Sequence, residues 1–243
     1  MTDDAPSRST RPLVALALAV VVVILLPRVP YVHWLLRPLG WLGTLVHETG
    51  HAMGAWAMGG VVSYVEVFPN GSGVAATSVG TSPWRRAVVA AGGLVGPAVA
   101  SVGLLWLGLG PRIARVGLGL LGLFLLGLAA FFTKGFATPI AVGWGAVALV
   151  CAWKLSGEWA RIGVLVVSVQ LALHVYRKSD YLFMAEATTG AGTITSDVGQ
   201  IALRLGGHYL MWGVAIGVLD VVLLGVGLLG FFFGDRLVAR FQR

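Results

Sequence analysis

The chain has 243 residues, of which 57% are hydrophobic and only 11% charged, and its mean hydropathy is +0.87. Soluble domains carry about 25% charged residues, so this composition excludes an ordinary soluble domain and predicts a multi-pass protein of the cell membrane, in contact with the lipid bilayer. The formal charge of +7 is spread over single and paired basic residues between apolar runs. That pattern is typical of loops at anionic headgroups and excludes a nucleic-acid partner. Because Cys151 is the single cysteine, an internal disulfide and a cysteine-based metal site are excluded as well.

The N-terminal residues 1–11 are polar, and we expect them to be disordered. An apolar run from Leu13 to Leu26 follows, and it is similar in length to the apolar part of a secretory signal. The segment Pro27-Arg28-Val29-Pro30 stands where such a signal would have small residues at its cleavage site. We therefore predict a retained first transmembrane helix at 13–26, with cleavage as the alternative.

A second transmembrane helix is predicted at 38–58, beginning at Pro38 and ending before Gly59-Gly60. It contains the motif His47-Glu48-Thr49-Gly50-His51. Histidines four residues apart lie on one face of a helix, so both imidazoles can bind one metal ion. The glutamate beside the first histidine can accept a proton from water at that ion. The alternative is a set of polar side chains packed in a bundle, which would be costly in lipid without a function.

Residues 61–79 predict a β-hairpin, because β-branched and aromatic residues precede the turn signal Pro69-Asn70-Gly71. An exposed strand edge can hold a peptide in extended form, and we name Val65 and Val67 as candidate substrate-binding positions. The alternative is an ordinary connector that lies on the membrane surface.

Five more transmembrane helices are predicted, at 84–109, 112–132, 138–154, 160–176 and 208–233. Trp84-Arg85-Arg86 reads as an interfacial anchor for the first of them. The fold class is then an all-α polytopic membrane protein with about seven transmembrane helices and a small β-hairpin, in a single domain at 12–233 with a basic tail at 234–243. With seven transmembrane helices, nine of the 17 basic residues lie on one side of the membrane and eight on the other. The charges therefore do not decide which side faces the cytoplasm.

A catalytic zinc site usually has three protein ligands, so a third must come from elsewhere in the chain. Asp197 lies in a segment just before the last transmembrane helix, and Asp220 lies in the middle of that helix. On chemistry alone the two are equal candidates. Asp197 could instead cap a helix that begins near Val198. Weaker candidates are Glu66, His174, Glu186 and His208.

Three blocks together resemble the site-2 protease family of intramembrane zinc metalloproteases, in its short bacterial B-like branch. They are the HExxH block with the glycines and turn that follow it, the stretch 85–98 with its Gly96-Pro97 element, and the Ser196-Asp197 segment. The likeness runs with gaps from about residue 33 to residue 230. It implies Zn²⁺ held by His47, His51 and Asp197, with Asp220 in reserve, and Glu48 as the catalytic base.

The resemblance implies a zinc metalloendopeptidase that hydrolyses peptide bonds of membrane-anchored proteins within or near the bilayer, in regulated intramembrane proteolysis. Two alternatives remain from the residues themselves: an ion- or metal-handling transporter, and a non-catalytic membrane scaffold. A transporter tends to show internal repeats and polar residues spread over several helices, and this chain shows neither. The sequence predicts no oligomeric state.

Overall fold

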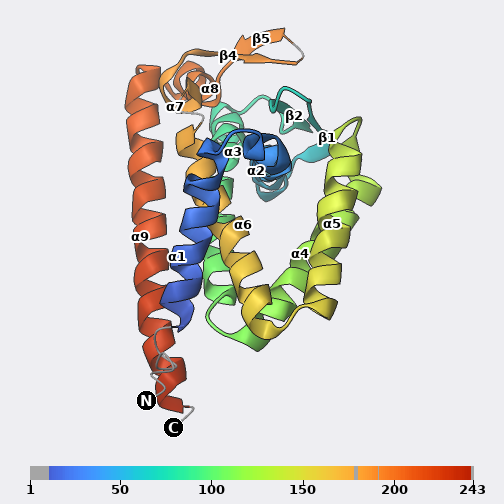
Figure 1. Cartoon of the computed structure of the whole chain (residues 1–243). Coiled ribbons are helices and arrows are strands. Elements are labelled where there is room, and N and C mark those ends of the chain that lie inside the picture. Colours follow the sequence, from blue (N-terminus) through green and yellow to red (C-terminus); the bar gives the residue numbers. More distant parts are fainter. Residues whose placement is uncertain (1–10, 178–179, 191, 242–243) are drawn as a thin grey trace, which may run out of the picture.

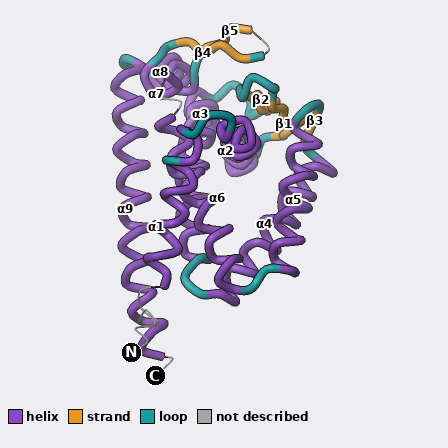
Figure 2. Tube along the Cα trace, in the orientation of Figure 1, coloured by secondary structure: helices purple, strands orange, loops and turns teal. Residues whose placement is uncertain are grey.

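Most of the chain is helical in the computed structural model, which describes residues 11–177, 180–190 and 192–241 (Figure 1). The long helices form a bundle, and the strands gather at the end where the last helix, α9 (Tyr209–Phe241), begins (Figures 1 and 2). Residues 1–10, which make up most of the segment expected to be disordered, lie outside the described residues.

Among the described residues, four helices are long and apolar enough to cross a membrane. They are α3 (Pro83–Leu107), α4 (Pro111–Phe131), α5 (Ala137–Lys154) and the Tyr209–Gly234 part of α9. The helices predicted at 84–109, 112–132, 138–154 and 208–233 are thus confirmed, although α9 continues to Phe241 through most of the predicted tail. The first apolar helix, α1 (Arg11–Ile24), is also present, but it is shorter than these four helices. A 3₁₀ turn (Leu26–Arg28) follows it. The count of seven transmembrane helices is not confirmed.

Two further helices occupy predicted positions but carry polar side chains into the bundle. They are α2 (Val32–Ala57), which begins before Pro38 and includes it, and α6 (Gly157–Arg177). In α6, Ser168 exchanges hydrogen bonds with Ser101 of α3: each hydroxyl donates to the other's carbonyl oxygen, at 2.8 and 2.9 Å. Gln170 donates to the carbonyl oxygen of Leu39 in α2. These polar groups are buried against other helices, so both elements belong to the interior of the bundle.

The predicted hairpin is present. Strands β1 (Val61–Val67) and β2 (Gly73–Ser78) pair in antiparallel fashion, and Gly71 supplies the positive φ of +86° that the turn needs. A two-residue strand, β3 (Thr133–Lys134), adds to β1 in parallel, and the Val65 amide donates to the carbonyl oxygen of Phe132 at 2.6 Å. The order of the sheet is β2-β1-β3, so β1 is its central strand.

The polar segment before α9 folds into α7 (Asp180–Phe183), a second hairpin of β4 (Glu186–Thr189) and β5 (Gly192–Thr195), and α8 (Asp197–Leu205). The sequence did not predict this hairpin. It contacts the first hairpin, because the Gly190 amide donates to Ser72 Oγ at 2.9 Å. Figure 1 shows both hairpins and α8 at the same end of the bundle.

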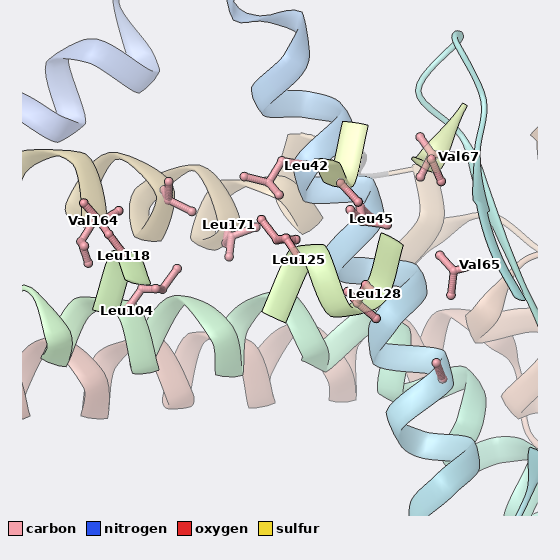
Figure 3. Close-up of a cluster of buried hydrophobic side chains, with 14 of the residues drawn as sticks. Leu42, Leu45, Val65, Val67, Leu104, Leu118, Leu125, Leu128, Val164 and Leu171 are labelled. Carbon is pink, nitrogen blue, oxygen red and sulfur yellow. The ribbon is translucent and has the colours of Figure 1, made fainter. Parts of the chain in front are cut away.

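The largest group of buried apolar side chains joins α2, α4, α6 and the central strand (Figure 3). Leu42 and Leu45 of α2 lie near Leu125 and Leu128 of α4, and Val65 comes from β1. All five are at most 5% exposed. This group packs α2 against α4, α6 and β1, and it thereby helps to set the position of the HExxH motif.

Candidate metal centre

The HExxH helix and α3 touch backbone to backbone through glycines. A Cβ placed on Gly50 would lie 2.2 Å from the carbonyl oxygen of Gly92, and one on Gly92 would lie 2.5 Å from that of Gly50. A Cβ on Gly96 would also contact the Gly50 backbone, at 3.0 Å. Helices approach this closely where small residues remove the side chains between them. The motif on α2 is thereby held directly against α3.

One consequence of this approach is a fixed orientation for His51. Its Nδ1 donates to the carbonyl oxygen of Val89 on α3 at 2.8 Å, which leaves the lone pair of Nε2 to bind a metal. The imidazole also lies against Gly93, where a Cβ would come 2.2 Å from Nε2. Both the hydrogen bond and the missing side chain are therefore needed for this position of His51.

The carboxylate across from the histidines comes from the first residue of α8. Ser196, rather than Asp197, caps this helix, because the Gly199 amide donates to Ser196 Oγ at 3.1 Å. The Ser196 hydroxyl in turn donates to the carbonyl oxygen of Met184. The alternative role of Asp197 as helix cap is thus wrong, and its side chain projects into the site.

His47, His51 and Asp197 come together as one group, with one possible ligand atom from each within 4.8 Å of the others. Asp197 Oδ2 lies 3.1 Å from His47 Nε2, and Oδ1 lies 3.4 Å from His51 Nε2. The two Nε2 atoms are 3.2 Å apart. Two imidazole nitrogens and one carboxylate are a donor set that suits Zn²⁺. Burial alone would raise the pKa of Asp197, but the charge and hydrogen bonds of the two histidines outweigh it, and this pKa lies below its ordinary value.

Glu48 lies beside this group and against the first residue of β2. Its side chain is buried, with the residue 5% exposed. A Cβ on Gly73 would lie 2.6 Å from Glu48 Oε1, so only glycine leaves room for the carboxylate at that point. The start of β2 therefore positions the carboxylate that the sequence assigns as the base.

The other carboxylate candidate lies apart from the histidines. Asp220 is 1% exposed in α9, and its two oxygens have no hydrogen-bond partner within the part of the chain that the structure describes. It is not a member of the group that contains the histidines, and neither are Glu66, His174, Glu186 and His208. His174 packs instead against Gly43 of α2.

An open cavity of about 510 Å³ gives access to the group. His47, Glu48, His51 and Asp197 line it, together with most residues of β2 and residues from β4–β5. Val65 and Val67 do not line it. Both are fully buried in the central strand, and Val65 already donates its amide to the β3 side. The structure thus does not bring these two valines to the cavity: the outer edge of the sheet there belongs to β2.

Some cavity residues were not assigned a site role from the sequence. Arg86, read as an interfacial anchor, lines the cavity, and so do Gln200 and Arg204 of α8. One signal was available: Gln200 and Arg204 follow Asp197 by three and seven residues, which puts all three on one helical face. No such signal indicated that Arg86 lines the cavity or that Val89 binds His51, because both contacts follow from the packing of α3 on α2.

The amino-acid sequence matches a known protein family. The model of the family described as Peptidase M50B-like matches residues 14–227, a stretch that contains the HExxH motif and Asp197. The chain belongs to the M50B-like peptidase family. The resemblance to the site-2 proteases is thereby confirmed, and the M50B-like match covers all helices that build the candidate metal centre. Comparisons with curated proteins and with solved structures gave no match.

Proposed function

We propose that this M50B-like peptidase is a zinc metalloendopeptidase of the cell membrane that cleaves membrane-anchored proteins within or near the bilayer. The observation that carries the proposal is the meeting of His47, His51 and Asp197 beside buried Glu48, in an open cavity. Four apolar helices long enough to cross a membrane support the membrane location in this proposal. A substrate that is itself anchored in the membrane can reach it by lateral movement. A role in regulated intramembrane proteolysis is part of the proposal.

The chemistry follows from the donor set. A bound Zn²⁺ would act as a Lewis acid, lowering the pKa of water toward about 7 and polarising the peptide carbonyl. Glu48, which is not among the three ligands, accepts the proton of the attacking water at its carboxylate and passes it to the leaving nitrogen. The carbonyl oxygen of Val89 accepts a hydrogen bond from His51 Nδ1–H, and this bond keeps Nε2 directed at the site.

The open edge of β2 is suited to hold the substrate. A peptide bond inside a helix is hydrogen-bonded to its own chain, so the substrate must be extended before it can be cut. In the described part of the chain no strand pairs with the outer edge of β2, and β2 begins at Gly73 beside Glu48. A substrate strand added there would pass directly by the catalytic carboxylate.

Glu48→Gln tests the function. The amide keeps the size of the side chain but cannot accept the proton, so we expect cleavage of a membrane-anchored model substrate to fall by at least about 100-fold. Zinc content, measured by elemental mass spectrometry on the purified protein, should stay at the wild-type level. Undiminished cleavage by Glu48→Gln would contradict the mechanism. Zinc binding without proteolysis in the wild type would favour the metal-handling or scaffold alternatives.

A further inference from the structure

One face of α8 lines the cavity with polar side chains. Asp197, Gln200 and Arg204 follow at spacings of three and four residues, which brings them to the same face of the helix. Arg204 is seven residues beyond the ligand Asp197, a rise of about 10 Å along a helix. The cavity therefore has a basic group about two helical turns from the metal centre.

A second basic group enters the same cavity from α3. Arg86 stands seven residues before Gly93, the glycine that lies against the His51 imidazole, so it too is about 10 Å from the metal centre along its helix. Its Nε donates to the carbonyl oxygen of Gly80 at 2.9 Å. This bond fixes the guanidinium beside the end of the β2 segment and leaves its two terminal nitrogens as further donors.

Neither arginine is neutralised by a neighbour. Within the described residues, neither Arg86 nor Arg204 forms an ion pair, whereas Asp197 is paired with the two histidines. The two acidic residues that line the cavity, Glu48 and Asp197, both belong to the catalytic group. The cavity thus offers guanidinium groups without a carboxylate of its own to bind them, and a guanidinium fork suits a carboxylate.

Building on the proposed function, we propose that Arg86 and Arg204 bind an acidic side chain of the substrate, Asp or Glu, about three residues from the bond that is cut. The spacing follows from the distance: about 10 Å of helix corresponds to about three residues of extended peptide at 3.3 Å each. A phosphate of a lipid headgroup is the other anionic group of suitable chemistry. A peptide is favoured because Arg86 shares its cavity with the β2 edge, whereas its exposed neighbour Arg85 is outside the cavity lining.

The test uses the full chain, loaded with zinc, in phosphatidylcholine vesicles. The probe is a library of peptides with one apolar span followed by a randomised segment of about ten residues, whose cut sites are read by mass spectrometry. We expect Asp and Glu to be enriched about three positions from the cut. Substrate pairs that differ by Glu or Gln at this position should show a rate ratio of about ten in the wild type, because Gln loses the charge-assisted hydrogen bonds. This ratio corresponds to about 1.4 kcal/mol.

Substitutions of the two arginines test whether they cause this Glu/Gln rate ratio. Arg86→Gln and Arg204→Gln should each bring the Glu/Gln ratio close to one, and Arg204→Glu should shift the preference toward Lys. Arg204 is exposed, so its variants keep the test valid if Arg86→Gln impairs folding. Arg85→Gln is the matched control, because it removes the same charge outside the cavity and should leave the ratio unchanged.

The outcomes separate the two proposals. Cleavage that depends on Glu48 but shows no acidic preference overturns the role of the arginines and leaves the peptidase function standing. Equal cleavage by wild type and Glu48→Gln, or none by either, overturns the function itself. If Arg86→Gln slows the Glu and Gln substrates equally, and phosphatidylglycerol in the vesicles changes both rates alike, the arginines bind headgroups and the proposal is wrong.

Discussion

His51 Nδ1 on α2 donates a hydrogen bond to the carbonyl oxygen of Val89 on α3, with 2.8 Å between the two atoms. This hydrogen bond joins a candidate metal ligand to the backbone of another helix, so the direction of Nε2 depends on how closely the two helices approach. The glycine contact between Gly50 and Gly92 sets that approach. The ligand geometry is therefore a property of the helix pair.

Gly92→Ala should disturb the metal centre without changing any ligand. The added methyl would come 2.5 Å from the carbonyl oxygen of Gly50, which forces the two backbones apart. We expect a loss of about 1–3 kcal/mol in the free energy of unfolding, as for overpacked cores, and weaker zinc binding. A thermal melt and a zinc titration measure the two effects. Gly103→Ala is the control in the same helix, because its Cβ would meet no atom within 4 Å; equal losses in both variants would contradict the role of the contact.

Asp197→Asn and Asp220→Asn distinguish the two carboxylates. Asp197 lies within 3.4 Å of both histidines, whereas Asp220 is not a member of their group. We expect Asp197→Asn to lower zinc affinity by about 10- to 100-fold or more, since a neutral amide replaces a charged ligand. Asp220→Asn should keep zinc at the wild-type level. The reverse pattern in metal analysis would assign the third ligand to Asp220.

Ala75→Pro tests whether the substrate adds to β2. Amides along an antiparallel strand point alternately to the two sides, and the Phe68 amide donates to Ser72 while the Val65 amide points to β3. Ala75 stands opposite Val65 in this pairing. Because the Val65 amide points away from β2, the pair shares no hydrogen bond, and the Ala75 amide points to the open edge of the sheet. Proline there removes a donor for the substrate without removing one that β1 uses.

We expect Ala75→Pro to lower the cleavage rate of a model substrate by about tenfold or more, with zinc retained. Ala75→Ser keeps the amide and serves as the control. If both variants cleave at the same rate, the substrate does not pair at this edge.

Ser72→Ala should loosen the contact between the two hairpins. It removes the hydroxyl that accepts the Gly190 amide at 2.9 Å, a bond worth about 1 kcal/mol. Hydrogen exchange at residues 186–195 should then become about fivefold faster. Ser78→Ala, at the exposed end of β2, is the control and should change exchange little. Unchanged exchange in Ser72→Ala would show that the second hairpin is held by other contacts, such as that of Gly190 with Phe68.

The two candidate histidine ligands and the first hairpin could be predicted because their signals are local. His47 and His51 are one helical turn apart, and the turn at Asn70-Gly71 lies between two strand-like runs. Asp197 could be favoured only through family resemblance. No spacing rule relates it to His47, and its position follows from the packing of α8 on α3.

The position of Val65 and Val67 away from the cavity could not be predicted, for a definite reason. Whether a strand edge is open depends on all its neighbours, and the neighbour here is β3, a strand of two residues between α4 and α5. So short a strand leaves no periodic pattern in the sequence. The same holds for Arg86, whose side chain could face headgroups or the cavity until the direction of α3 against α2 is known.

The three candidate ligands come from distant parts of the chain, His47 and His51 near its start and Asp197 near its end. A metal ion bound to them would act as a cross-link that closes a loop of about 150 residues, the kind of restraint that a disulfide gives other proteins. This chain, with one cysteine, has no such bond. Zinc would then hold α8 against α2 as well as activate water, so its removal should loosen the segment that leads into α9.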